Sequence, residues 1–151
     1  MSTAHPPGHL LKAGRFRIEA EIGSGGFGIT YRATRVADNA AVVIKELFPG
    51  DLIARDANGV SVVAHGPDDQ FAQCLDRFIR EAEFLKRLDH PNIVRVDDTF
   101  LDNGTAYFSM PHGRISPTRR LRCAHAIGWR RRTSRQNLTA DGIGNGCSCT
   151  E

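Results

Sequence analysis

A short glycine-rich segment, Gly23-Ser24-Gly25-Gly26-Phe27-Gly28, is the first part of this sequence whose residue types and spacing suggest chemistry. Glycines spaced as G-x-G-x-x-G let backbone N–H groups approach phosphate oxygens, because a Cβ atom would hold the backbone away. Dinucleotide-binding folds continue this motif into a helix. Here Thr30 and Tyr31 follow, and such residues are typical of a strand. The pattern therefore predicts a loop that joins two strands and whose backbone can approach phosphates, with Phe27 at its tip shielding the site from water.

Lys45 and Glu81 are charged residues that lie among apolar ones. Lys45 follows Ala41-Val42-Val43-Ile44 at the end of a predicted buried strand, and a charge in such a place needs a partner. Glu81 lies between Phe78 and Leu85 on the apolar stripe of a predicted helix. Taken singly, Lys45 could be an ordinary strand lysine, and Glu81 could lie at the edge of the stripe. Together with phosphates they could form a charge-balanced site.

The elements that position these residues begin with three strands. Residues 16–22 alternate apolar and charged side chains, residues 30–34 are rich in β-branched and aromatic types, and residues 41–45 are a short apolar run. Short turns between them indicate an antiparallel meander. Asn58-Gly59, flanked by valines, suggests an additional small hairpin. Residues 1–14 are polar and contain proline and glycine, which predicts a flexible N-terminal segment.

A helix and two further strands follow. Pro67-Asp68-Asp69 is a helix start, and the helix should end near His90-Pro91, since the residue before proline leaves the α region. Residues 93–96 and 105–110 are the fourth and fifth predicted strands. The helix carries an apolar stripe with steps of three and four: Phe71, Leu75, Phe78, Ala82, Leu85 and Leu88. The sequence thus predicts an α+β domain with a five-stranded antiparallel sheet and one helix.

This combination, with His90-Pro91-Asn92-Ile93-Val94 after the helix, resembles the protein kinases. More narrowly, Gly28-Ile29-Thr30-Tyr31, Ile44-Lys45-Glu46-Leu47-Phe48-Pro49 and Phe78-Ile79-Arg80-Glu81-Ala82 are similar to bacterial serine/threonine protein kinases. The resemblance covers residues 15–110. It implies the ATP-binding small lobe of a kinase, whose single helix is of the αC type, without the large lobe.

The resemblance also implies roles for individual residues. Gly23, Gly25 and Gly28 match the glycines that cover the phosphates, Lys45 matches the lysine that holds the α- and β-phosphates, and Glu81 matches the helix glutamate that pairs with this lysine. ATP is the expected cofactor, with Mg²⁺ as in the family. The complete set implied to bind ATP is Ile22, Gly23, Ser24, Gly25, Gly26, Phe27, Gly28, Ile29, Thr30, Val43, Lys45 and Met110.

Two of these positions depart from the commoner family pattern. Thr30 stands where valine is usual, and Val43 replaces the alanine of V-A-I-K. The extra carbons of Val43 would press on the adenine face and shift or tighten nucleotide binding. Met110 matches the residue that gates the back of the pocket.

The sequence lacks the parts that transfer the phosphoryl group. Neither H-R-D-x-x-x-x-N nor D-F-G, which supply the base and the metal ligands, occurs among the 151 residues. Residues 1–110 contain 12 Lys/Arg and 15 Asp/Glu, whereas residues 111–151 contain eight Arg and only Asp141 and Glu151 as acidic residues. Such a change predicts a basic tail over 111–151, disordered or produced by a shift of reading frame near residues 109–114. The chain alone is then expected to be inactive.

Two alternative functions fit the same residues. A non-catalytic pseudokinase fragment would bind ATP or another kinase chain and regulate it. Alternatively, Arg130-Arg131-Arg132 could bind nucleic acid or an acidic partner, but Trp129 is the only aromatic residue after Met110, which disfavours nucleic acid. Protein substrates remain expected partners of a kinase. No run of about 18 apolar residues occurs, which predicts a cytoplasmic protein without a membrane span.

Overall fold

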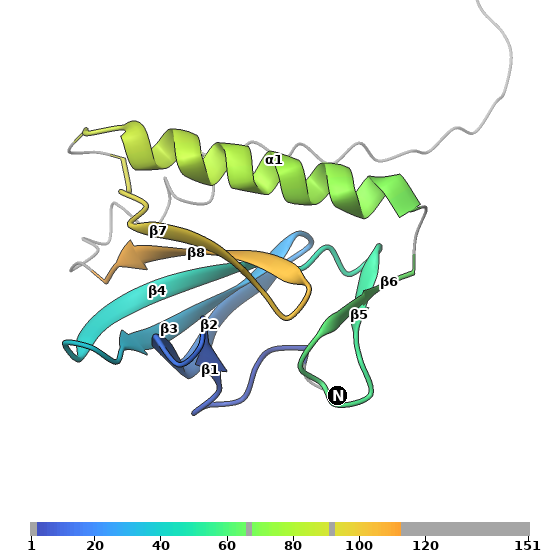
Figure 1. The fold of residues 1–151 in the computed structure, drawn as a ribbon, viewed down its shortest axis with the longest axis horizontal. Helices are drawn as coiled ribbons and strands as arrows, with labels where there is room; N and C mark the ends of the chain where they lie inside the picture. Colours follow the sequence, from blue (N-terminus) through green and yellow to red (C-terminus); the bar gives the residue numbers. More distant parts are fainter. Residues whose placement is uncertain (1–2, 66–67, 91–92, 113–151) are drawn as a thin grey trace, which may run out of the picture.

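The computed structural model describes residues 3–65, 68–90 and 93–112. These residues form an antiparallel sheet with a long helix lying across one face and a small hairpin beside it (Figure 1). The strands are β1 (Leu10–Leu11), β2 (Phe16–Gly25), β3 (Gly28–Arg35), β4 (Ala40–Leu47), β5 (Ile53–Arg55), β6 (Val62–Ala64), β7 (Asp98–Asp102) and β8 (Thr105–Pro111), and the helix α1 spans Asp68–Arg87.

The main sheet has six strands in the order β1-β2-β3-β4-β8-β7, and β5 and β6 form a separate two-stranded sheet. The predicted fold class is therefore confirmed: an antiparallel sheet with one helix. The strand count differs, because β1 adds a sixth strand beside β2. The small hairpin predicted around Asn58-Gly59 is also confirmed, since β5 and β6 pair across this turn.

The predicted fourth strand lies at a different place from the one expected. The strand is β7, whereas residues 94–97 precede it without regular structure. Val96 is fully buried in a cluster with Ala82 and Phe108, so the apolar character of this segment fills space beneath α1. The Asp97 amide joins the sheet by donating to the Ser109 carbonyl at 2.8 Å. The apolar pattern thus marked a buried segment, not a strand.

The prediction of a flexible N-terminal segment needs correction for the described residues. Residues 3–15, which we call the N-terminal strap, run along the sheet and contain β1 (Figure 1). His5 is 2% exposed and Leu11 is fully buried. The Gly8 amide donates to the Ile18 carbonyl at 2.7 Å, which extends the pairing with β2 beyond β1. Polar composition concealed this packing, because the anchoring residues are isolated in the sequence.

The alternation of side chains gives the sheet two different faces. One, the helix face, carries Val43 and Lys45 of β4 and Phe108 of β8, and α1 contacts β7 and β8 on this side. The other, the cap face, carries Ile44 and Glu46 of β4 and is covered by the strap and the β5–β6 hairpin. The larger core cluster lies on the cap face. Both faces of the sheet are therefore covered, one by the helix and the other by the strap and the hairpin.

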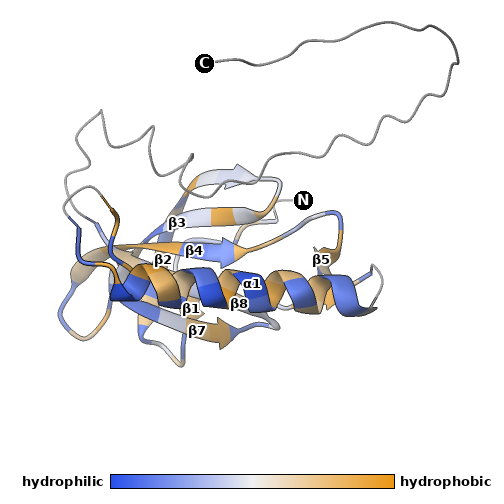
Figure 2. Cartoon of the chain, turned by 90° about the horizontal axis from the view of Figure 1, so that it is seen from above, coloured by the Kyte–Doolittle hydropathy of each residue, from blue (hydrophilic) through white to orange (hydrophobic). Residues whose placement is uncertain are grey.

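Helix α1 lies across the sheet with an amphipathic pattern. Figure 2 looks down on it and shows hydrophobic and hydrophilic residues alternating along its length. Ala82 is fully buried, and Phe78 and Leu85 pack beside it, so the predicted stripe is the side that meets the sheet. The helix ends at Arg87, where Lys86 and Arg87 complement the negative end of the helix dipole. None of the described helical segments is long and apolar enough to cross a membrane.

Candidate functional site

The glycine-rich segment forms the tight connection between β2 and β3. Gly25 pairs with Gly28, and Gly26-Phe27 make the turn between them. Gly23 pairs with Thr30, so the segment continues the hairpin instead of opening a helix. The structure therefore has the strand–loop–strand arrangement that distinguishes a phosphate-covering lid from a dinucleotide-binding loop.

The glycines of this segment are present for different physical reasons. A Cβ atom added to Gly28 would lie 2.4 Å from the backbone oxygen of Glu46, so the close approach of β3 and β4 requires glycine there. A Cβ atom added to Gly23, Gly25 or Gly26 would meet no described atom within 4 Å, and none of the three has a positive φ. The packing of the chain therefore does not explain these three glycines. Close approach of a ligand to the backbone would explain them.

Lys45 lies on the helix face beside the positions predicted to enclose a nucleotide. It pairs with Thr30 of β3 and Phe108 of β8, and Val43 pairs with Met110. Directly paired residues share a face, so these five side chains form one continuous surface. The Lys45 Nζ lies 5.9 Å from the centroid of the Phe108 ring. Lys45, Thr30 and Met110 are half-buried, and Val43 is buried.

Glu81 is brought to the same side of the sheet by α1. It is half-buried and precedes Ala82, which is fully buried against Phe108. The Phe78 and Phe108 rings lie 5.0 Å apart between their centroids, which fixes the helix over β8. Phe108 is thus packed beside the residue next to Glu81 and also beneath the Lys45 ammonium. The Lys45–Glu81 ion pair itself stays a prediction.

Some predicted site residues lie apart from Lys45. Ile29 pairs with Glu46, and its side chain is 2% exposed in the core of the cap face, so only its backbone could approach a ligand on the helix face. Ile22 lies at a bulge between β2 and β3 and is 52% exposed. Phe27 is exposed at the turn, and its carbonyl accepts a hydrogen bond from the Phe48 amide at 3.1 Å. Ser24 is exposed and pairs with Ile29.

A buried carboxylate with several hydrogen-bond donors lies directly behind Lys45, and the sequence analysis did not identify it. Glu46 is fully buried on the cap face. Its Oε2 accepts hydrogen bonds from the Tyr31 hydroxyl at 2.7 Å and from the Arg55 guanidinium at 2.8 Å. Its Oε1 accepts one from the Tyr107 hydroxyl at 2.9 Å and lies 3.5 Å from His5 Nε2. We call these five residues the Glu46 cluster.

The Glu46 cluster keeps its carboxylate ionised. Burial alone raises the pKa of Glu46, but hydrogen bonds from His5 and Arg55 and the Arg55 charge outweigh it and hold the pKa below its usual value. The same cluster raises the pKa of both tyrosines well above the ordinary range, first through burial and then through the Glu46 charge. The Arg55 side chain is 7% exposed, so this is a nearly desolvated ion pair that Tyr31, Tyr107 and His5 surround.

A sequence signal for Glu46 does exist. The two-residue period of β4 places Glu46 on the same face as Val42 and Ile44, both of which are buried. A glutamate at such a position needs partners, as argued above for Lys45. The identity of those partners is not local, because His5 and Tyr107 lie 102 residues apart in the chain.

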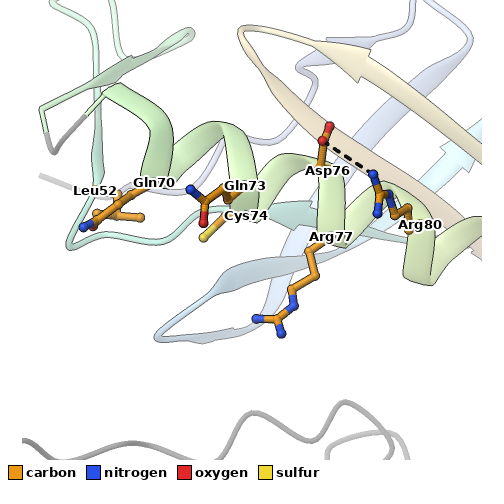
Figure 3. A pocket seen from close by; sticks show the side chains of 7 residues that line it. All are labelled: Leu52, Gln70, Gln73, Cys74, Asp76, Arg77 and Arg80. Carbon is orange, nitrogen blue, oxygen red and sulfur yellow. Dashed lines mark ion pairs between the residues drawn. The ribbon is translucent and has the colours of Figure 1, made fainter.

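A groove of about 610 Å³ lies elsewhere, between α1 and the loop after β4 (Figure 3). Its polar side chains are largely exposed: the Asp76 and Arg80 side chains are 72% and 84% exposed and form a loose ion pair at 4.0 Å. No residue of the glycine-rich segment lines it. The lining residues are Leu52, Gln70, Gln73, Cys74, Asp76, Arg77 and Arg80.

Comparison with curated proteins finds kinases. The chain is 33% identical over 127 residues to the serine/threonine-protein kinase PknK of Mycobacterium tuberculosis and 35% identical over 92 residues to the serine/threonine-protein kinase pkn2 of Myxococcus xanthus. These matches cover 82% and 61% of this chain but only 10% and 9% of the relatives. Because residues 1–112 make up less than 82% of the chain, the similarity to PknK continues past residue 112. No family model matches the chain.

Comparison with solved structures gives the same result for the fold. A structure described as the apo form of PpkA-294 has a TM-score of 0.70 and 32% sequence identity, with 82% of this chain and 44% of that chain covered. The kinase domain of Mycobacterium tuberculosis PknI has a TM-score of 0.50 with 24% identity, and 72% of this chain and 36% of that chain are covered. The chain thus spans less than half of each of these two solved chains.

Proposed function

Because the chain is a relative of bacterial serine/threonine protein kinases and has the small-lobe fold of a kinase domain, we propose that it is the ATP-binding portion of a serine/threonine protein kinase. The observation that carries this proposal is the glycine-rich segment. Its Gly23, Gly25 and Gly26 have open space where a side chain would lie, and the fold does not require glycine at these positions. A nucleotide phosphate close to the backbone is the ligand that such a segment suits.

The remaining residues of the helix face suit the other parts of ATP. The Lys45 side chain lies on the same face of the sheet as Gly28 and Thr30 of β3, and its ammonium would neutralise phosphate charge. Glu81 on α1 would orient that ammonium. Val43, Thr30 and Met110 offer apolar and half-buried surface for the adenine. ATP, when bound, supplies the phosphoryl group. The residues of this chain bind and orient it and exclude water from one side.

The residues present do not suit Mg²⁺. Among the described residues no group of three or more His, Cys, Asp or Glu side chains could hold a metal ion. The sequence also contains no D-F-G segment, from which a kinase supplies a metal carboxylate. We therefore assign no step to Mg²⁺ in this chain.

Phosphoryl transfer to a protein hydroxyl needs groups that this sequence does not contain. The catalytic aspartate of H-R-D-x-x-x-x-N would orient the attacking hydroxyl, and no such segment occurs in the 151 residues. We propose that the chain binds ATP weakly and transfers no phosphoryl group by itself. Protein substrates would be contacted only in combination with a large lobe.

Binding of a fluorescent ATP analogue to the purified chain tests the proposal. The wild-type chain should bind it, and Lys45→Met should abolish binding while leaving the thermal midpoint unchanged. Lys86→Met is the matched control, because Lys86 lies in the last turn of α1 with a 43% exposed side chain. Equal affinities for wild type and K45M, or no binding by wild type, would contradict an ATP-binding function.

A further inference from the structure

We infer that the N-terminal strap is a positioning element of the nucleotide site, which acts through Glu46 to hold β4 where Lys45 faces α1. The inference rests on the proposed function for its effect on ATP, but its structural part can be measured without nucleotide. It concerns residues 3–15, a segment outside the strands and helix that carry the predicted site residues. Three groups of contacts carry it.

The first group anchors the beginning of the strap on the cap face. The His5 backbone amide donates to the Tyr31 hydroxyl at 3.1 Å, and His5 Nε2 lies 3.0 Å from the Tyr107 hydroxyl. Because the Tyr107 hydroxyl donates its proton to Glu46, Nε2–H of His5 must be the donor in this contact. The His5 ring also stacks on His9, with ring centroids 4.2 Å apart and planes 4° from parallel. The strap is thus held by specific polar contacts as well as by apolar packing.

The second group connects this anchor to β4 and its neighbours. Tyr31 belongs to β3 and Tyr107 to β8, the two strands that flank β4 in the sheet, and both donate to the Glu46 carboxylate. Arg55 adds the counter-charge from the β5–β6 hairpin, and its Nε donates to the Thr3 carbonyl of the strap at 2.8 Å. The strap therefore completes a network of hydrogen bonds around Glu46, the residue next to Lys45.

The third group fastens the far end of the strap to the opposite edge of the sheet. The Lys12 amide donates to Asp102 Oδ2 at 2.7 Å, and the Lys12 ammonium pairs with Asp98 at 2.6 Å. Arg15 also pairs with Asp98, at 3.1 Å. Lys12 further lies over the Phe100 ring, 5.2 Å from its centroid. Since β1 and β7 are the two edge strands, these contacts join the edges of the sheet around the cap-face core.

The consequence for Lys45 follows from the geometry of a strand. Lys45 and Glu46 are consecutive, so any shift or rotation of β4 that frees Glu46 also moves Lys45. If the strap detaches, the Glu46 carboxylate loses its contact with His5. The cap face then also loses the residues that cover it, and water can reach the carboxylate. Local opening of β4 then becomes easier, and the lysine spends less time in the position that binds phosphate.

Amide hydrogen exchange of the full chain tests the structural part. His5→Ala should accelerate exchange of the β4 amides from Ile44 to Leu47 by roughly tenfold, the change expected when a buried hydrogen-bonding group is removed. His5→Gln, which keeps a donor, should restore part of the protection. His65→Gln is the matched control, since His65 is exposed at the end of β6. Should H5A fail to fold, the double substitution Lys12→Ala and Arg15→Ala carries the same test, with Arg17→Ala on exposed β2 surface as its control.

Affinity for the fluorescent ATP analogue, measured on the same variants, tests the functional part. The strap variants should weaken binding by roughly the factor by which β4 exchange increases, and the controls should not. Faster exchange confined to the strap, residues 3–15, with β4 protected as in wild type, would overturn the inference. Faster exchange in β4 with unchanged affinity would overturn the positioning of Lys45. A wild-type chain that binds no nucleotide would refute the proposed function and the strap's effect on ATP, while exchange alone would still decide whether the strap holds β4.

Discussion

Lys45 and Glu46, neighbours in β4, point to opposite faces of the same sheet and meet opposite environments. Lys45 is half-buried on the helix face, with its ammonium over Phe108. Glu46 is fully buried on the cap face, where it accepts hydrogen bonds from Tyr31, Tyr107 and Arg55. The hydrogen bonds of Glu46 on the cap face thus hold β4 in place, while Lys45 lies on the helix face at the proposed phosphate site.

The glycines of the β2–β3 connection should separate into two classes on substitution. Gly28→Ala should destabilise the chain by about 1–3 kcal/mol, because its Cβ would lie 2.4 Å from the Glu46 backbone oxygen. Gly25→Ala should change stability by less than about 0.5 kcal/mol, yet weaken nucleotide binding. Urea denaturation and titration with the ATP analogue on each variant measure the two effects. Equal loss of stability in both variants would show that packing explains all the glycines.

Removal of the Arg55 charge should be among the most damaging single changes to the fold. Arg55→Met leaves the Glu46 carboxylate buried without its counter-charge, which costs about 3–5 kcal/mol. Arg80→Met, which removes an 84% exposed guanidinium from a loose pair, should cost less than about 0.5 kcal/mol. The free energy of unfolding in urea compares the two. A cost for R55M as small as that for R80M would show that the pair is not desolvated.

Stability should decrease on the acid side in two steps. The pKa of His9 is lowered from 6.5 by burial and then by the neighbouring His5, so the unfolded chain binds this proton more readily and stability falls as the pH drops below 6.5. The pKa of Glu46 is lowered from 4.5 despite burial, so its contribution is present above that pH and is lost as the pH falls through the folded-state pKa. Urea titrations from about pH 3 to about pH 8 measure both. His9→Asn should remove the first step alone, and an unchanged first step in H9N would assign it to another group.

Stability should also decrease on the alkaline side. The folded state raises the pKa of Tyr31 and Tyr107 above the ordinary value of 10.0, first through burial and then through the Glu46 charge. The unfolded chain releases these protons more readily, so stability is lost as the pH rises above 10.0. Tyr107→Phe should halve this loss, and absorbance of the phenolate during alkaline unfolding should show both tyrosines ionising only as the chain unfolds. Phenolate formation in the folded chain would contradict this.

The coding DNA should reveal the origin of the basic tail. We expect translation of a neighbouring reading frame across the region that encodes residues 105–151 to restore H-R-D and D-F-G segments. The similarity to PknK that continues past residue 112 moves the expected change of frame toward later residues. Resequencing this region decides the matter. If no kinase segment occurs in any frame, the arginine-rich tail is genuine, and a regulatory role for the ATP-binding module becomes the better hypothesis. Residues 113–151 lie outside the described part of the chain.

The sequence predicted best where one local pattern was sufficient. The glycine spacing, the apolar run before Lys45 and the stripe of α1 each identified an element, because period and turn chemistry are local. Sequence patterns failed to predict contacts between residues far apart in the chain. His5 contacts Tyr107 and Lys12 pairs with Asp98, and neither pair leaves a periodic signal. Val96 was assigned to a strand because a buried irregular segment and a short strand look alike in composition.

The contacts of Lys12 with Asp98 and Asp102 have a consequence for whether the protein associates with other chains in solution. A sheet edge with free backbone groups is a template on which another chain can add a strand, and short edge strands with charged side chains discourage this. Here β1 is two residues long and β7 carries two aspartates that hold the strap. A truncated chain that began at Phe16 would expose the β2 edge and remove the contacts of Lys12 and Arg15 with those aspartates. Recombinant versions that lack residues 1–15 should therefore aggregate, whereas the full chain should remain dispersed.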